Sequence, residues 1–104
     1  MRVLNFNVNG QKLQRDHESD FTGIIQGSKG YLQCGFNLSR EWAGCKIAAS
    51  FYRFGQEIDA APVIGGNCII PDSVTDYREF ELSLVGVHKG YRITTNRVKI
   101  EQEV

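Results

Sequence analysis

The chain holds two histidines and three cysteines, and these residues limit the chemistry that it could perform. A serine or cysteine nucleophile needs a base within hydrogen-bond reach, and a third group must hold that base in place. His88 stands beside Lys89 and Gly90 in an expected hairpin tip, where exposure is favoured. Cys34 alternates with apolar positions, so we interpret it as a small buried side chain. The sequence therefore predicts no catalytic residue, and we expect that the protein is not an enzyme.

The densest polar cluster, Asp16-His17-Glu18 with Asp20, has side chains that can bind metal ions. It lacks the glycine and the distal glutamate of a calcium loop, and side chains that are adjacent along a chain usually point apart. The cysteines, at positions 34, 45 and 68, lack the close spacing of zinc ligands. Their odd number also makes a poor disulfide framework. We interpret the cluster as a solvated loop and predict no metal site and no cofactor.

Composition and charge exclude several classes of partner. The 12 basic residues equal the 12 acidic residues, and no run of Lys or Arg is present. Nucleic-acid binding normally uses a basic face, so we expect no nucleic-acid partner, while a net charge near zero makes self-association easier. No apolar stretch approaches the roughly 18 residues that span a membrane, and residues 1–5 do not resemble a secretory signal. We therefore expect no membrane partner and synthesis in a cytoplasm.

Apolar residues recur at every second position along most of the chain, which indicates β-strands. Asn9-Gly10 and Gly65-Gly66 predict tight turns between them. Pro62 suits an edge strand, and we expect the N-terminal hairpin over 3–15 to form another edge. The expected strands cover residues 3–8, 21–25, 31–38, 46–54, 56–64, 68–70, 80–87 and 91–100.

About seven or eight short strands at roughly ten-residue spacing predict an all-β fold. We expect a single domain over 1–104, an immunoglobulin-like β-sandwich of antiparallel strands. Residues 72–78 should form a turn or one helical turn, and 101–104 should fray. The alternation slips at Asn96-Arg97, which favours a bulge there.

Trp42 is the most informative aromatic residue. Ser39 can cap one helical turn before it, and Gly44 can end that turn. A buried Trp often fills the core of an immunoglobulin-like sandwich, whereas Trp is also enriched at protein interfaces. We favour the core because Trp42 directly follows a strand whose alternate residues point inward, and the interface remains the alternative.

Several landmarks between Tyr31 and Ile100 resemble, in order and spacing, a family of small phage and prophage virion proteins. These proteins are found near the tail-fibre, baseplate or head-fibre genes of phages of Gram-positive bacteria. The resemblance implies a non-catalytic β-sandwich module located in the virion. Such a module would contact other virion proteins, or a second copy of itself, as an adaptor, a decoration protein or a fibre or baseplate component. The landmarks are Phe36-Asn37-Leu38-Ser39-Arg40-Glu41-Trp42-Ala43-Gly44, Ala49-Ser50-Phe51, Cys68-Ile69-Ile70-Pro71, and Val85-x-Val87 followed by Gly90-Tyr91-Arg92-Ile93-Thr94-Thr95-Asn96.

Two other functions fit the same features. A small phage protein that binds and inhibits a host enzyme needs the same compact scaffold and no catalytic residues. A carbohydrate-binding module that contacts the host cell wall could stack sugars on exposed tyrosines, for which the candidates are Tyr31, Tyr52, Tyr77 and Tyr91.

Overall fold

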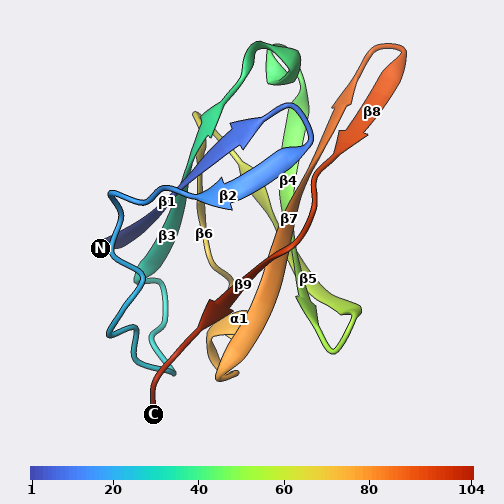
Figure 1. Ribbon diagram of the computed structural model, residues 1–104. Helices are drawn as coiled ribbons and strands as arrows, with labels where there is room; N and C mark the ends of the chain where they lie inside the picture. The colour runs from blue at the N-terminus through green and yellow to red at the C-terminus, as the bar shows by residue number, and fades with distance from the viewer.

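A computed structural model describes residues 1–104 as two facing β-sheets in a body of 43 × 29 × 20 Å (Figure 1). The first sheet contains β1 (Arg2–Asn9), β2 (Lys12–Arg15), β3 (Leu32–Leu38) and β6 (Asn67–Ile69). The second contains β4 (Lys46–Arg53), β5 (Gln56–Val63), β7 (Glu79–His88), β8 (Tyr91–Thr94) and β9 (Val98–Glu101). A 3-10 turn (Arg40–Trp42) and the helical turn α1 (Asp72–Thr75) complete the fold. The prediction of a β-rich fold with two sheets is confirmed.

The strand order is β2-β1-β3-β6 in the first sheet and β5-β4-β7-β8 in the second, with β9 also paired to β7. β1 and β3 run parallel, with Leu4 opposite Cys34 and Phe6 opposite Phe36. The prediction that all strands are antiparallel is therefore wrong for this pair. The reason is the long connection over 16–31, which returns the chain to the starting end of β1 after β2 has taken the other side of that strand.

The predicted strand over 21–25 does not form, although Ile24 is buried. Gly23 has a φ of +64°, which breaks an extended run, and Ile25 makes only an isolated bridge to Glu103. Within this segment the Arg2 guanidinium donates hydrogen bonds to the backbone carbonyls of Thr22 and of Gly23, the latter at 3.0 Å. The segment is thus held as a loop by polar contacts to the chain terminus rather than by a strand ladder.

The C-terminal part departs from prediction at two points. The expected strand over 91–100 is divided into β8 and β9, which both pair with β7, so a full break replaces the predicted bulge. The end of the chain does not fray at Gln102, which is 4% exposed. Its Nε2 donates to the carbonyls of Thr75 at 3.1 Å and Tyr77 at 2.7 Å, which secures the terminus against α1. The predicted helical turn within 72–78 is confirmed as α1.

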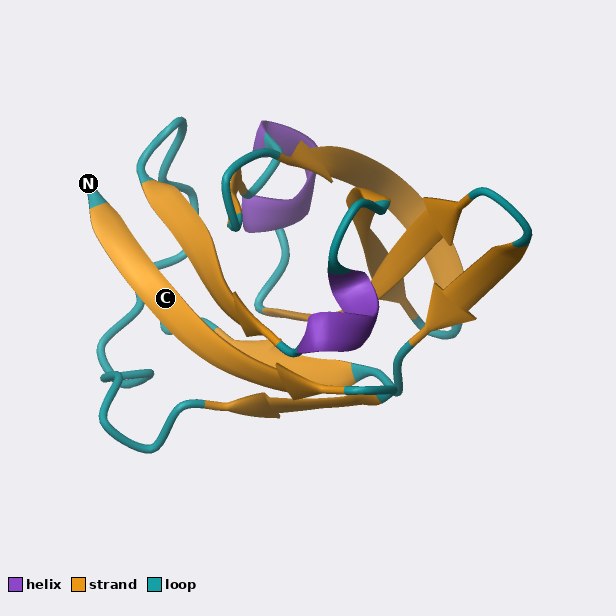
Figure 2. Cartoon of the chain, turned by 90° about the horizontal axis from the view of Figure 1, so that it is seen from above, coloured by secondary structure: helices purple, strands orange, loops and turns teal.

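The core lies between the sheets, and both short helical turns lie between the two layers of strands in the view from above (Figure 2). Phe80, Leu82 and Leu84 point inward from β7, as their alternation predicts. Trp42 is 2% exposed, and its indole Nε1 donates to the Gly10 carbonyl at 2.8 Å. The prediction that Trp42 belongs to the core is confirmed.

Candidate docking surfaces

One side of the sandwich is sealed by hydrogen bonds between the sheets. Asn96, between β8 and β9, accepts a hydrogen bond at Oδ1 from Leu13 N–H at 2.8 Å and donates from Nδ2 to Leu13 C=O at 3.0 Å. Gln11 adds a bond from its side chain to the carbonyl of Thr94 at 3.1 Å. The predicted edge position of the N-terminal hairpin is confirmed for β2. However, its central backbone groups are already paired and cannot accept a new strand.

The opposite side of the sandwich is open. There β5 and β6 are the edge strands of different sheets, which confirms the predicted edge position of β5. The turn at Gly65-Gly66 joins them, and only Ile64 and Asn67 pair across it, at 2.9 and 3.1 Å. Beyond this bridge the two strands diverge, so a notch remains between them.

The outer edge of β5 offers almost no hydrogen-bond donor. Pro62 has no N–H, and Ala60 N–H is taken by the carboxylate of Asp59 at 2.7 Å. Ile64 N–H is already used in the bridge to Asn67. Because these alternate positions face the same way along an edge strand, β5 is protected against extended pairing with another chain.

The edge of β6 keeps one open position, at Ile69. Ile70 N–H donates to Leu32 C=O at 2.9 Å, and Phe36 N–H donates to Gly66 C=O at 2.8 Å. Gly66 and Ile70 thus direct these backbone groups toward β3. Because backbone groups alternate in direction along a strand, the N–H and C=O of Ile69 point away from β3. The notch therefore presents one backbone donor and one acceptor beside apolar side chains.

We call this region the open edge and define it by Pro62, Ile64 and Ile69. Ile64 is 75% exposed and Ile69 is 47% exposed. They border a shallow hollow of about 430 Å³ that contains no charged side chain among its lining residues. Protein–protein interfaces are depleted of charge at their centres, and this composition suits a neutral partner.

A second exposed surface lies at the tip of the β4–β5 hairpin. Phe54 is 83% exposed and has a φ of +52°, followed by Gly55 at +80°. Two successive positive φ values form a tight hairpin turn that favours Asn or Gly, and the left-handed conformation costs a bulky residue about 1–2 kcal/mol. Phe54 is the only residue other than glycine with a positive φ. Strain of this kind at an exposed aromatic residue is typical of a functional position.

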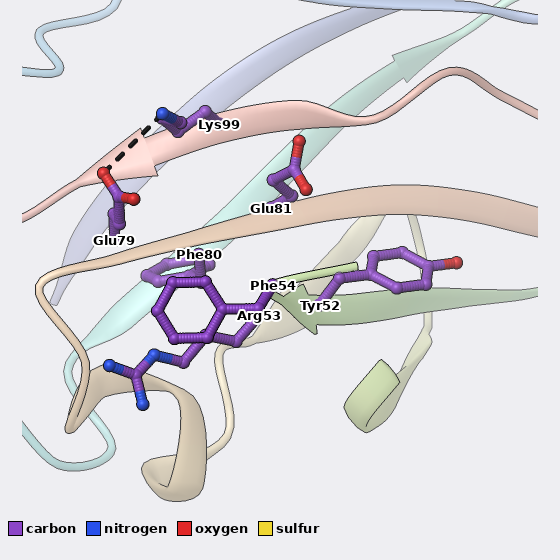
Figure 3. Close-up of a pocket in the computed structure, with 7 residues that line it drawn as sticks. All are labelled: Tyr52, Arg53, Phe54, Glu79, Phe80, Glu81 and Lys99. Atoms are coloured by element: carbon purple, nitrogen blue, oxygen red, sulfur yellow. Dashed lines mark ion pairs between the residues drawn. The ribbon is translucent and has the colours of Figure 1, made fainter. Parts of the chain in front are cut away.

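Arg53 fixes the surroundings of this ring. Its guanidinium carbon lies 4.6 Å from the centre of the Phe54 ring and 3.9 Å from that of Tyr77. We call Arg53, Phe54 and Tyr77 the tip platform. Figure 3 shows Phe54 and Arg53 side by side. Both line a hollow of about 220 Å³, whose other lining residues include members of β7 and β9.

Two carboxylates, Glu79 and Glu81, line the hollow beside the platform. Glu79 lies 3.6 Å from the ammonium of Lys99, and both side chains are about half exposed (Figure 3). Glu81 stands between Tyr52 and Lys99 in the strand register. Cross-strand pairs of this kind are typical of a solvated sheet face, so we assign these groups to the polar rim of the tip platform.

Of the residues first considered for catalysis, Cys68 borders the hollow of the open edge, whereas His88, Cys45 and Cys34 are not among the residues that line either surface. His88 stacks on Tyr91 at 5.5 Å in the exposed β7–β8 hairpin. Cys45 lies 3.7 Å from the Tyr91 hydroxyl, and this hydrogen bond is the main cause that raises the pKa of Tyr91. Cys34 is fully buried, as predicted.

The polar cluster near position 16 is a loop whose carboxylates bond to the local backbone. Asp16 Oδ1 accepts from Glu18 N–H at 3.1 Å, and Asp20 Oδ1 accepts from Thr22 N–H at 2.8 Å. Hydrogen bonds from Thr22 are the leading cause that lowers the pKa of Asp20. No three metal-binding side chains converge in the structure.

Three of the four tyrosines proposed for sugar stacking have another group over or beside the ring. The guanidinium of Arg97 lies 3.7 Å from the centre of the Tyr52 ring, and Arg53 covers Tyr77. Tyr91 is stacked with His88. The remaining tyrosine, Tyr31, is 48% exposed, and a single ring offers little for sugar binding.

Comparisons with protein-family models, with curated proteins and with solved structures found no match to the chain. None of the helical segments combines the length and the apolar composition that crossing a membrane requires. The open edge and the tip platform are therefore the features of the chain that bear on its function.

Proposed function

We propose that the chain is a structural protein of a phage particle, an adaptor, decoration or fibre/baseplate component that holds neighbouring virion proteins without catalysis. The observation that carries the proposal is the placement of two exposed surfaces at opposite ends of β5, of which one is aromatic with a charged rim and the other is aliphatic. The tip platform precedes this strand and the open edge follows it. Eight residues in extended conformation span about 25 Å, so two partners can dock without overlap.

The two surfaces have different chemistry, which favours two different contacts. Phe54 is a large exposed ring that the Arg53 guanidinium contacts, and aromatic anchors contribute strongly to protein association. The open edge instead offers aliphatic side chains with one free backbone donor and acceptor at Ile69. A module with two unlike surfaces is suited to link successive subunits. The order of the virion-protein landmarks between Tyr31 and Ile100 supports the same function.

Mass spectrometry of purified particles of the phage that encodes the chain tests this proposal. We expect the protein in mature particles at a fixed ratio to a tail, baseplate or head protein. Its absence from washed particles would contradict the proposal. Affinity capture from infected cells completes the test, because a stoichiometric host enzyme in place of virion proteins would identify an inhibitor instead.

A further inference from the structure

Two buried cysteines face each other across the first sheet. Cys34 of β3 and Cys68 of β6 are directly opposite in an antiparallel pair, with their side chains in the core. The hydrogen bonds that flank them place them at a hydrogen-bonded position, where the Cα atoms are about 5.5 Å apart. Disulfides usually join Cα atoms that are about 4.4–6.8 Å apart. The strand register thus places the two thiols at a separation that a disulfide can span.

The two thiols differ in exposure and in acidity. Cys68 is 5% exposed and lines the open edge, whereas Cys34 is completely buried. Hydrogen bonding with Cys68 raises the pKa of Cys34, and hydrogen bonding with Cys34 lowers the pKa of Cys68. Within this pair, Cys68 is therefore the thiol that is nearer to solvent and that ionises first.

We propose that Cys34 and Cys68 form a cross-strand disulfide when the folded protein meets a low-molecular-weight disulfide such as oxidised glutathione. The Cys68 thiolate attacks one sulfur of that reagent, whose S–S bond breaks and releases one glutathione thiolate. Cys34 then loses its proton to solvent and attacks the Cys68 sulfur of the mixed disulfide, which releases the second glutathione thiolate. The protein loses two protons and two electrons, and the reagent is reduced to two glutathione molecules.

The position of β6 permits this closure. Facing side chains in a sheet have Cβ atoms about 4.5–5.5 Å apart, whereas a disulfide needs about 3.5–4.5 Å, so β6 must move inward by about 1 Å. β6 has three residues and lies at the edge of the sheet with β3 as its only partner strand, so a shift of this size would disturb few hydrogen bonds. The bond would pin the strand that carries Ile69. The proposal depends on the strand register and not on the phage assignment.

Trypsin separates the three cysteines into different peptides, since it cleaves after Lys and Arg. Cys34 falls in 30–40, Cys45 in 41–46 and Cys68 in 54–78. The folded full chain is treated with oxidised glutathione, its free thiols are alkylated, and the digest is analysed by mass spectrometry. We expect 30–40 linked to 54–78, with 41–46 linked to neither peptide and its Cys45 either alkylated or bound to glutathione.

The same treatment in denaturant is the control for chance pairing. In an unfolded chain loop closure favours the shorter separation, that of Cys34 and Cys45. Selective linkage of Cys34 to Cys68 in the folded protein alone therefore reports the strand register. Cys45→Ser should keep the linkage, and Cys34→Ser should leave a stable glutathione adduct on Cys68.

Three outcomes in the folded wild-type chain would overturn the proposal. They are alkylation of all three cysteines, a disulfide that links Cys45 to Cys34 or to Cys68, and a glutathione adduct that persists on Cys68 while Cys34 stays free. None of these results bears on whether the protein is present in phage particles, so the two proposals fail separately.

Discussion

The side-chain amide of Asn96 bonds both backbone groups of Leu13, the N–H at 2.8 Å and the carbonyl at 3.0 Å. The Asn96 side chain thus makes the two hydrogen bonds with Leu13 of β2 that a neighbouring strand would otherwise make. It also links the first sheet to the segment between β8 and β9. On the opposite side of the sandwich no side chain bridges the sheets in this way. Only the backbone bridge between Ile64 and Asn67 joins the two edges there, and Ile64 and Ile69 are exposed beside it. The asymmetry between these two sides leads to the proposed docking at the open edge.

Asn96→Ala should lower the free energy of unfolding by about 1–3 kcal/mol, because it leaves the N–H and C=O of Leu13 without partners. Urea unfolding followed by Trp42 fluorescence measures the change. Asn37→Ala is the matched control, since its amide makes only an exposed 3.4 Å contact with Asn7, and we expect a change within about 0.5 kcal/mol. Equal losses of unfolding free energy in the two variants would show that the contact of β2 with the segment between β8 and β9 does not depend on Asn96.

Gly86→Ala should destabilise the fold by about 1–3 kcal/mol, because overpacking forces the neighbouring core to shift. A Cβ atom at this position would lie 2.7 Å from Cζ3 of Trp42. Thermal unfolding of the single variants and of the double variant with Trp42→Leu measures the coupling. The cost of Gly86→Ala should shrink in the Trp42→Leu background, and an unchanged cost would contradict close packing of this pair.

Phe54→Gly should leave the free energy of unfolding unchanged or raise it by up to about 1 kcal/mol, since it removes the strained left-handed conformation. The same variant should weaken incorporation into particles because the tip platform loses its ring. Phe54→Tyr is the control that retains the ring, and we expect incorporation like that of wild type. A large loss of stability in Phe54→Gly would instead give Phe54 a structural role.

The carboxyl of Asp59 should titrate below its ordinary pKa of 3.8, and Ser73→Ala should move that pKa upward. Ser73 Oγ donates to Asp59 Oδ2 at 2.6 Å, which is the main cause of the lowering. Because the pKa is lower in the folded state, this contact stabilises the fold above pH 3.8 and its contribution disappears as the pH falls through the lowered pKa. Carboxyl chemical shifts in an NMR titration measure the pKa of Asp59 in the wild type and in Ser73→Ala.

Asp20 is the internal control in that titration. Its lowered pKa arises from Thr22 and should not respond to Ser73→Ala. If the titration of Asp59 is unchanged in the variant, the contact between α1 and β5 does not form in solution.

Local alternation predicts most strands, because each strand buries every second side chain against the opposite sheet. Phe80, Leu82 and Leu84 show this directly in β7. The alternation of apolar residues does not reveal which strands pair, so it does not predict the parallel contact of β1 with β3. The stretch over 21–25 looks like a strand in sequence, yet the φ of Gly23 and the contacts of Arg2 hold it as a loop.

The candidate surfaces were only partly predictable. Pro62 predicts that β5 is an edge strand. Sequence alternation places Phe54 at the end of the preceding strand, because its left-handed conformation arises only when the hairpin closes. The pairing of Cys34 with Cys68 was also hidden, since their wide spacing along the chain says nothing about register. In both cases the special position of the residue arises from tertiary structure, and nothing in the local sequence pattern distinguishes it.

The most direct test of docking at the open edge compares two lysine variants in competition with the wild-type chain during particle assembly. Ile69→Lys puts a charge into the open edge, and Val87→Lys puts one at a similarly exposed site on β7, 52% exposed against 47% for Ile69. Circular dichroism first establishes that both variants are folded. We then expect Ile69→Lys to be incorporated at least about tenfold less than wild type, because an unpaired charge is costly to bury. Val87→Lys should be incorporated like wild type. Equal incorporation of the two variants would contradict the account.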